Sequence, residues 1–222
     1  MIDSLLLALI CAGAFLLGSV PPGLLVAKIR GVDIRSVGSG NIGATNVLRS
    51  VGKAEAAATL VFDILKGFIP VAAVAPIFSS LGMQLPAVTA PGFEQADPLA
   101  VAQGFAGVCA ILGHNFSIFL KFRGGKGVAS SIGAVLALSP YVGLVVITLW
   151  LFTFSKSGIS SLGALVAFAA LPFAMHFMAG SPEKTVIACL ITALIFIRHI
   201  DNIRRLITGT EGKVAPGRNK KR

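Results

Sequence analysis

The chain has 222 residues, of which 55% are hydrophobic and only 13% are charged, and its mean hydropathy is +0.86. This composition excludes an ordinary water-soluble domain and is typical of an integral membrane protein. A net charge of +10 would suggest nucleic-acid binding in a soluble chain. Here the basic residues lie between long apolar runs, so we expect membrane topology to be their cause and expect no nucleic-acid partner.

Six apolar runs are candidates for membrane helices, because a span needs roughly 20 apolar residues. They cover residues 5–27, 56–81, 99–120, 128–154, 162–179 and 185–197. The basic residues decide the orientation, since all of them except Lys66 and Lys184 lie in four segments that follow the first, third, fourth and last runs. The positive-inside rule places these four segments in the cytoplasm.

The fourth run must then turn back within the membrane, because a single crossing would put Lys156 and the basic C-terminal segment outside. Ser139 followed by Pro140 is the natural break, since proline lacks an amide donor and disfavours helix in the residue before it. The first half, residues 128–138, would make only roughly 16 Å of helix. We therefore predict an all-α membrane protein with about seven transmembrane or membrane-embedded helices. Its N-terminus is outside, its C-terminus is cytoplasmic, and its fourth and fifth helices are short.

The first cytoplasmic segment contains a glycine-rich polar motif, residues 31–49, which we call the first motif. Its glycines alternate with small hydroxyl and amide side chains. Glycine lets a ligand approach the backbone closely, and free N–H groups beside an arginine can hold an anion. The candidates for such a site are Ser39, Gly40, Asn41, Thr45, Asn46 and Arg49. A solvated connecting turn fits the same spacing equally well.

A stronger signal precedes the fourth helix, where Gly124, Gly125 and Gly127 surround Lys126. We call residues 124–127 the glycine loop. Backbone donors, a helix N-terminus and an ammonium can converge there on a phosphate. A plain basic loop beside the membrane would not need three glycines, so we favour phosphate binding. His114, shortly upstream, can be a ligand, a base or a hydrogen-bonded structural residue.

The third motif, residues 198–213, follows the last apolar run. At helical spacing His199, Asn202 and Arg205 share one face. Such a face is often only solvated, but this motif lies on the same predicted side of the membrane as the other two. It would supply a histidine and an amide beside an anion site, which favours a functional interpretation.

Three other polar residues lie apart from these motifs. Asp63 and Lys66 are spaced to pair within the second span, either for function or to position the helix. Ser161 can bind a ligand or cap the helix that follows. We expect residues 1–222 to form one membrane domain that ends in a basic, mobile cytoplasmic tail from about residue 212, suited to anionic lipid headgroups.

Together the three motifs resemble the PlsY family, the bacterial membrane acyltransferases that transfer an acyl group from acyl phosphate to position 1 of glycerol 3-phosphate. The matching positions are residues 38–47 with Arg49, 63–67, 113–115 with 123–128, and 198–206 with 209–211. The resemblance covers nearly the whole chain. It implies a seven-helix fold in the bacterial cytoplasmic (inner) membrane, with the active site facing the cytoplasm. The implied products are 1-acyl-glycerol 3-phosphate and inorganic phosphate.

The resemblance also implies roles for individual residues. Those with a role in activity are Ser39, Arg49, His199 and Asn202. Residues 124–127 match the family's phosphate-binding loop, and Glu211 matches a mainly structural position. Ala164 stands where family members often carry a second serine, three residues after the one matched by Ser161, so this sequence departs from the family at that position.

We expect direct attack of the glycerol 3-phosphate hydroxyl on acyl phosphate, because the sequence shows neither a nucleophile triad nor a metal-binding cluster. Accordingly we expect no metal and no cofactor. Lys126, Arg49 and the loop amides would stabilise the departing phosphate and the developing oxyanion. The proton acceptor is either His199 or a substrate phosphate, and the sequence leaves both open.

Two other classes of protein compete with this hypothesis. A transporter of a phosphate-bearing anion or lipid should carry polar groups near the membrane midplane and often has repeated halves. A small membrane scaffold would explain the hydrophobicity but not three glycine- and amide-rich motifs. The partners expected of an acyltransferase are its two substrates, membrane lipids and a soluble enzyme that forms acyl phosphate. We expect the chain to be a monomer.

Overall fold

The computed structural model describes residues 2–87 and 96–214, and every regular element in these ranges is a helix. The long helices are α1 (Ile2–Ser19), α4 (Lys53–Ser80), α5 (Pro98–Asn115), α7 (Pro140–Ser157), α8 (Ser160–Ala174) and α9 (Pro182–Arg198). The shorter elements are α2 (Pro22–Ile29), α3 (Ala44–Ser50), η1 (Ile118–Leu120), α6 (Val128–Leu138), η2 (Met175–Ala179) and α10 (Ile200–Ile207). Part of the predicted basic tail, residues 215–222, lies outside the described residues.

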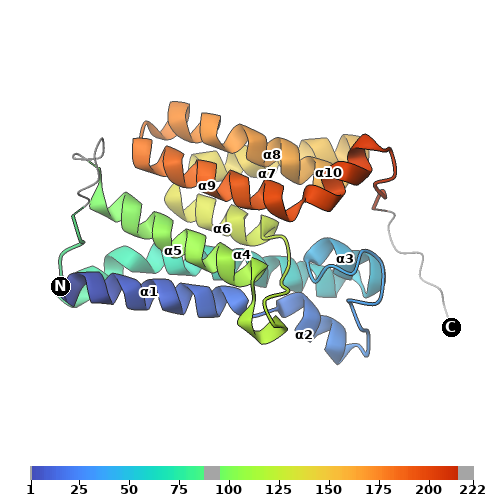
Figure 1. The fold of residues 1–222 in the computed structure, drawn as a ribbon, viewed down its shortest axis with the longest axis horizontal. Coiled ribbons are helices and arrows are strands. Elements are labelled where there is room, and N and C mark those ends of the chain that lie inside the picture. Colours follow the sequence, from blue (N-terminus) through green and yellow to red (C-terminus); the bar gives the residue numbers. More distant parts are fainter. Residues whose placement is uncertain (1, 88–95, 215–222) are drawn as a thin grey trace.

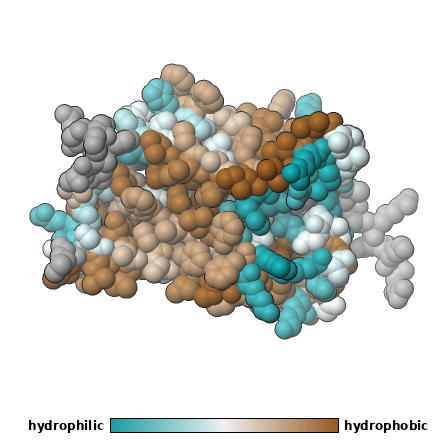
Figure 2. Space-filling view, viewed as in Figure 1, coloured by the Kyte–Doolittle hydropathy of each residue, from teal (hydrophilic) through white to brown (hydrophobic). Residues whose placement is uncertain are grey.

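The long helices lie side by side, with the start of α1 at one end of the bundle and α2, α3 and α10 at the other (Figure 1). Figure 2 shows a broad hydrophobic band over the long helices and hydrophilic residues gathered at the end that carries α2 and α10. Within the described ranges, five helical segments are long and apolar enough to cross a membrane, and α9 with α10 forms a further candidate bent by 63°. The protein is therefore an integral membrane protein of the all-helical class.

The predicted break in the fourth apolar run is confirmed. α6 ends at Leu138, Ser139 is extended with φ −159°, and Pro140 begins α7. α6 has 11 residues, so the fourth helix is short as predicted. The prediction of a short fifth helix is wrong, because α7 has 18 residues and is long enough to cross. Its hydrogen bonding continues through polar residues beyond the apolar run, until Gly158 at φ +72° ends the helix.

Two further helix boundaries differ from the apolar runs. The first run is divided at Val20, because Pro21 and Pro22 lack the amide donors that would continue α1. The last helix begins three residues earlier than its apolar run, at Pro182, where the Ser181 side chain accepts the N–H of Lys184 as an N-cap. The capping residue Ser181 is polar, so a hydropathy pattern does not reveal that α9 begins beside it.

Glycines allow α4 and α6 to pack closely. A Cβ on Gly67 of α4 would collide with the backbone of Ser130 in α6, and a Cβ on Gly133 of α6 would collide with the carbonyl of Ile64 in α4. Small residues are the usual means by which helices approach one another in membranes. The short α6 is thereby held between α4 and the helices of the main core, and Lys184 donates to its final carbonyl, that of Leu138, at 3.0 Å.

A separate small core holds the first motif against the bundle. It is formed by Ala27 of α2, Ile34 and Ile42 of the first motif, Val47 of α3 and Ala56 of α4, all of them buried. Gly23 of α2 permits the contact, because a Cβ there would collide with the carbonyl of Ile42. The polar residues of the first motif are therefore fixed relative to α4.

Substitution of Gly133 by valine should destabilise the protein by about 1–3 kcal/mol, because the added methyl groups have no room against α4. The matched control is Gly13→Val in α1, where an added Cβ meets nothing within 4 Å. Thermal unfolding of the detergent-purified variants would measure the difference. Equal unfolding midpoints for the two variants would contradict the close packing of α4 and α6.

Candidate active site

The first motif is organised by the buried side chain of Asn46. Its Nδ2 donates to the carbonyls of Ile34, Val37 and Asn41 at 2.9–3.1 Å, and its Oδ1 accepts the N–H of Ser39 at 2.9 Å. Because its amide is engaged within the motif, Asn46 shapes the backbone around Ser39. A direct contact between Asn46 and a substrate stays a prediction.

Glycines permit this loop conformation. Gly38 and Gly40 have φ of +60° and +68°, in the left-handed region that favours glycine. At Gly38 a Cβ would also collide with Oδ1 of Asn46. The loop leaves the Ser39 side chain exposed, at the end of the bundle where the other motifs lie.

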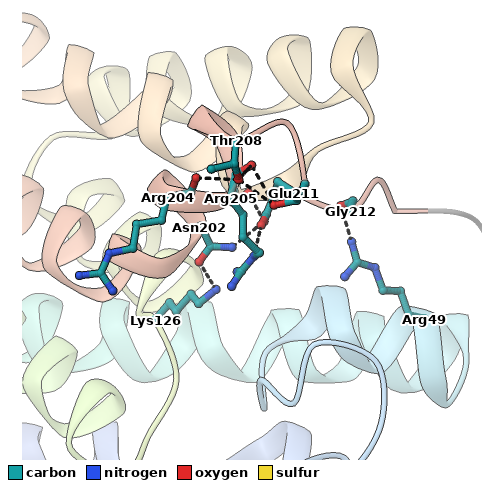
Figure 3. Close-up of polar contacts among 10 residues, drawn as sticks. Arg49, Lys126, Asn202, Arg204, Arg205, Thr208, Glu211 and Gly212 are labelled. Atoms are coloured by element: carbon teal, nitrogen blue, oxygen red, sulfur yellow. Dashed lines mark hydrogen bonds and ion pairs between the residues drawn. The ribbon is translucent and has the colours of Figure 1, made fainter.

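Residues of α3 join the first motif to the C-terminal half of the chain. The hydroxyl of Thr45 lies 3.1 Å from that of Ser160 at the start of α8. Arg49 donates to the carbonyl of Gly212 at 3.1 Å, which Figure 3 shows at the edge of the polar cluster. The first motif and the third motif, about 160 residues apart in the chain, are therefore neighbours.

The glycine loop pairs with the end of α5. The N–H groups of Gly124 and Gly125 donate to the carbonyls of Asn115 and His114 at 3.2 and 3.0 Å. These two amides are therefore engaged within the protein, and the predicted convergence of backbone donors on a phosphate concerns the other amides of this segment. A Cβ on Gly124 would collide with the His114 carbonyl, and one on Gly125 with Nε2 of its imidazole, so the glycines serve this close approach.

The amides that remain available belong to the start of α6. Gly127, with φ +82°, is the N-cap residue, and no side chain caps the helix. Across residues 126–130, the backbone N–H groups have no acceptor within the described part of the chain. A helix N-terminus with unpaired N–H groups attracts anions, because these groups carry its partial positive charge.

Arg198, the first residue of the third motif, holds the glycine loop from the side, a role that the sequence analysis did not assign to it. Its guanidinium donates to the carbonyls of Gly125 at 3.1 Å and Gly124 at 3.3 Å and lies 5.4 Å from the Phe116 ring centroid. Its position directly before His199 was the only available signal. Arg35 of the first motif makes a comparable bond to the carbonyl of Arg123 at 2.6 Å.

Lys126 and Asn202 connect the glycine loop to the third motif. Nζ of Lys126 donates to Oδ1 of Asn202 at 2.5 Å (Figure 3). The Asn202 side chain is oriented from its other end, because its Nδ2 donates to Oε1 of Glu211 at 2.5 Å. The amide therefore presents its oxygen to the ammonium.

Glu211 is the centre of this cluster. Its carboxylate accepts hydrogen bonds from Ser161 at 2.6 Å and Arg205 at 2.6 Å as well as from Asn202. Burial alone would raise the pKa of Glu211, but the hydrogen bonds from Ser161, Arg205 and Asn202 lower it overall. Ser161 does not cap α8, since the N-cap residue is Ile159. These contacts are compatible with the mainly structural role expected of Glu211, which stays a prediction.

His199 lies at the bend between α9 and α10 and is only 2% exposed. Its Nδ1 is 2.8 Å from the carbonyl of Ile195. Because a carbonyl only accepts, Nδ1 carries the hydrogen and Nε2 keeps its lone pair. Burial lowers the pKa of His199 to about 4, so the imidazole is neutral near pH 7. Asn202 and Arg205 share the face predicted for them, since both contact Glu211.

The site carries more cations than anions. Arg49, Lys126, Arg198 and Arg205 lie in it, and Glu211 forms an ion pair with Arg205, whereas the other three donate to neutral oxygens. Burial lowers the pKa of Lys126 to about 8, since desolvation disfavours the ammonium. In the described ranges no cluster of three or more His, Cys, Asp or Glu side chains could hold a metal ion. The excess of cationic side chains suits this site to the binding of an anion.

The fold and this site define an integral membrane protein with a polar, cationic centre at one end of its helical bundle. The sequence profile described as glycerol-3-phosphate acyltransferase matches residues 8–209. The chain belongs to this family. It is 41% identical to the glycerol-3-phosphate acyltransferase of Trichlorobacter lovleyi, covering 91% of this chain and 94% of that protein. With the enzyme of the same name from Rhizobium meliloti the identity is 43%, covering 90% and 88%.

Two solved structures are similar as well. Both are crystal structures of PlsY, described as an integral membrane glycerol 3-phosphate acyltransferase. The glycerol 3-phosphate form superposes with a TM-score of 0.80 at 35% identity, covering 94% of this chain and 96% of the other. The lysophosphatidic acid form has a TM-score of 0.77 at 36% identity, covering 93% and 94%. At 35–36% identity the similarity includes the amino-acid sequence as well as the arrangement of the helices.

Substitution of Glu211 by glutamine should lower activity at least about tenfold, because it removes the charge that pairs with Arg205 and replaces one acceptor oxygen by an NH2 donor, so the hydrogen bonds from Ser161, Asn202 and Arg205 cannot all be kept. The matched control is Asp201→Asn, another carboxylate of the third motif. Its pair with Arg204 is exposed and 3.4 Å long, so it should contribute little. Steady-state rates of both purified variants would test this, and equal rates would remove Glu211 from the centre of the cluster.

Proposed function

We propose that this protein transfers a fatty acyl group from acyl phosphate to the 1-hydroxyl of glycerol 3-phosphate, forming 1-acyl-glycerol 3-phosphate and inorganic phosphate. The observation that carries the proposal is that the three polar motifs meet at one end of the bundle, where Lys126 contacts Asn202 beside the uncapped N-terminus of α6. Both substrates bear a phosphate, and this arrangement suits one. The family and the two PlsY structures support the same activity.

The polar residues divide into two groups in this proposal. Lys126 and the amides at residues 126–130 bind substrate phosphate, with Gly124, Gly125 and Gly127 giving the loop its shape. The other contacts to substrate come from Ser39, Gly40, Asn41, Thr45, Arg49, Asn202 and Arg205. Asn46, Ser161 and Glu211 support them through the hydrogen bonds described above.

The reaction needs no enzyme nucleophile. The glycerol 3-phosphate hydroxyl oxygen bonds to the acyl carbonyl carbon, the carbon–oxygen bond to phosphate breaks, and the hydroxyl proton ends on inorganic phosphate. Lys126 and Arg49 stabilise the negative charge that develops on the carbonyl oxygen and on the leaving phosphate. Holding both substrates at one site supplies the orientation that such a direct transfer requires.

Two groups can carry the proton. Nε2 of His199 has a free lone pair, and the pKa of about 4 makes it a weak base in the free protein. A bound phosphate would raise that pKa through its negative charge. The second candidate is a substrate phosphate itself. An alanine variant of His199 with near-normal turnover would assign the proton to the substrate.

The acyl chain requires an apolar surface next to the polar centre. A groove lined by Val20, Leu24, Leu25, Phe119 and Leu120 lies where α1 breaks, and its η1 residues lead directly into the glycine loop. In the proposed orientation the polar end faces the cytoplasm of a bacterial inner membrane, and α6 completes a set of seven helices. The positive-inside distribution of Lys and Arg supports this side.

The transporter hypothesis receives no comparable support. The two charges within a span, Asp63 and Lys66, lie 2.8 Å apart and compensate each other. A transport site would need polar groups free to meet a solute near the midplane.

The first test is turnover by detergent-purified protein supplied with acyl phosphate and glycerol 3-phosphate, with acyl-CoA as the donor control. We expect lysophosphatidate and phosphate in equal amounts from acyl phosphate and no product from acyl-CoA. In membranes, inverted vesicles should accept added glycerol 3-phosphate and sealed right-side-out vesicles should not. Phosphate release that is independent of glycerol 3-phosphate would overturn the proposal.

The pH dependence should report Lys126. With a pKa of about 8, the ammonium is present below that pH, so kcat/KM for glycerol 3-phosphate should fall as the pH rises through about 8. Lys126→Arg keeps its charge, so its alkaline limb should move up by at least about one pH unit. Initial rates between pH 6 and 10 would show this. Superimposable alkaline limbs would mean that another group titrates.

A further inference from the structure

Beneath the glycine loop lies a chain of buried polar groups that the proposed reaction does not use. It consists of Asp63 and Lys66 of α4, His114 of α5 and Ser130 of α6, with exposed fractions of 2%, 5%, 4% and 0%. Burying charge among membrane helices is costly, so such groups are retained when they pair with each other or serve function. Their contacts lead in two directions from Asp63.

One direction leads to the first motif. Nζ of Lys66 lies 2.8 Å from Oδ1 of Asp63 and donates to the carbonyl of Val20 at 2.8 Å. Val20 directly follows the last residue of α1, and its carbonyl is available to Lys66 because Pro21 and Pro22 interrupt the helix. From this break α2 leads into residues 31–49. Lys66 therefore fixes the origin of the first motif relative to α4.

The other direction leads to the glycine loop. Nδ1 of His114 lies 3.4 Å from Oδ1 of Asp63 and 3.3 Å from the hydroxyl of Ser130. Since an ionised carboxylate only accepts, this pairing favours the tautomer with hydrogen on Nδ1. Nε2 then faces Gly125, against which no side chain would fit, and the His114 carbonyl accepts the Gly125 N–H at 3.0 Å. Both the ring and the backbone of His114 support the loop.

We propose that Asp63 is a positioning residue that sets the placement of the first motif relative to the glycine loop, acting through Lys66 on one side and His114 on the other. This rests on the proposed function, in which those two motifs contact the substrates. Asp63 and His114 touch no substrate in this scheme. Glycerol 3-phosphate depends on the placement most, because it has no acyl chain to anchor it.

The decisive comparison replaces the His114 imidazole by two amides. The Nδ2 of asparagine takes the place of Nδ1 and can still lie beside Oδ1 of Asp63, whereas the amide nitrogen of glutamine lies one atom further along, near Nε2. We expect His114→Gln to raise KM for glycerol 3-phosphate at least about tenfold and His114→Asn to stay within about threefold of the unsubstituted protein. His176→Gln, at an exposed position in η2, is the matched control and should change nothing.

KM is the chosen measurement because it does not depend on how much of the purified protein is folded. A purely structural role would lower the yield of active protein and leave KM unchanged. Equal KM values for His114→Gln and the unsubstituted protein would overturn the proposal. Equal changes of KM in the asparagine and glutamine variants would also overturn it, because the contact between Nδ1 and Asp63 would then have no effect on glycerol 3-phosphate binding.

A second variant decides the matter if the His114 substitutions do not fold. Asp63→Asn combined with Lys66→Met removes both charges and leaves neither unpaired, so it should fold. It should nevertheless show the same rise of at least about tenfold in KM for glycerol 3-phosphate. An unchanged KM would overturn the proposal. If the unsubstituted protein forms no lysophosphatidate, the proposed function fails instead, so the two failures are distinct.

Discussion

A carboxylate and an ammonium within a membrane helix have to compensate each other, because a bilayer offers no water to solvate them. In this protein the pair is Asp63 and Lys66, and each has a second contact outside its own helix. Lys66 reaches the end of α1, and Asp63 reaches His114 of α5 beside the start of α6. The cost of burying these charges therefore fixes four segments together, and the polar motifs extend from those segments.

The short α6 depends on its neighbours more than any other apolar helix. Eleven residues cannot cross a bilayer of roughly 30 Å alone. Gly67 and Gly133 let α6 lie directly against α4, and Lys184 satisfies its final carbonyl. Its other end, beside Lys126, has no side-chain cap, and its first N–H groups have no acceptor among residues 2–87 and 96–214. Because α4 and Lys184 hold α6 in place, the helix does not need an N-cap, and its N-terminus stays available to an anion.

The polar end of the bundle combines a cationic surface with one ordering carboxylate. Glu211 orients Asn202 and compensates Arg205, while Lys126 and Arg49 donate to the neutral oxygens of Asn202 and Gly212. Burial lowers the pKa of Lys126 and of His199, because desolvation disfavours their charged forms. A bound anion would supply the negative charge that stabilises these cationic forms. This is the physical basis for assigning phosphate-bearing substrates to it.

The composition and the apolar runs determined the membrane class and the candidate spans. Pro140 determined the break at Ser139, and a spacing of three residues determined the pairing of Asp63 with Lys66, because each of these follows from local chemistry. The three motifs also indicated which residue types to expect at the candidate site. Only the tertiary structure revealed that the N–H groups of Gly124 and Gly125 donate to carbonyls at the end of α5, and that Arg198 and His114 support this loop. It also revealed that Glu211 accepts hydrogen bonds from Ser161, Asn202 and Arg205. These partners are up to 74 residues apart in the chain. Sequence spacing encodes the face of one helix, whereas which faces meet is decided by packing among all of them.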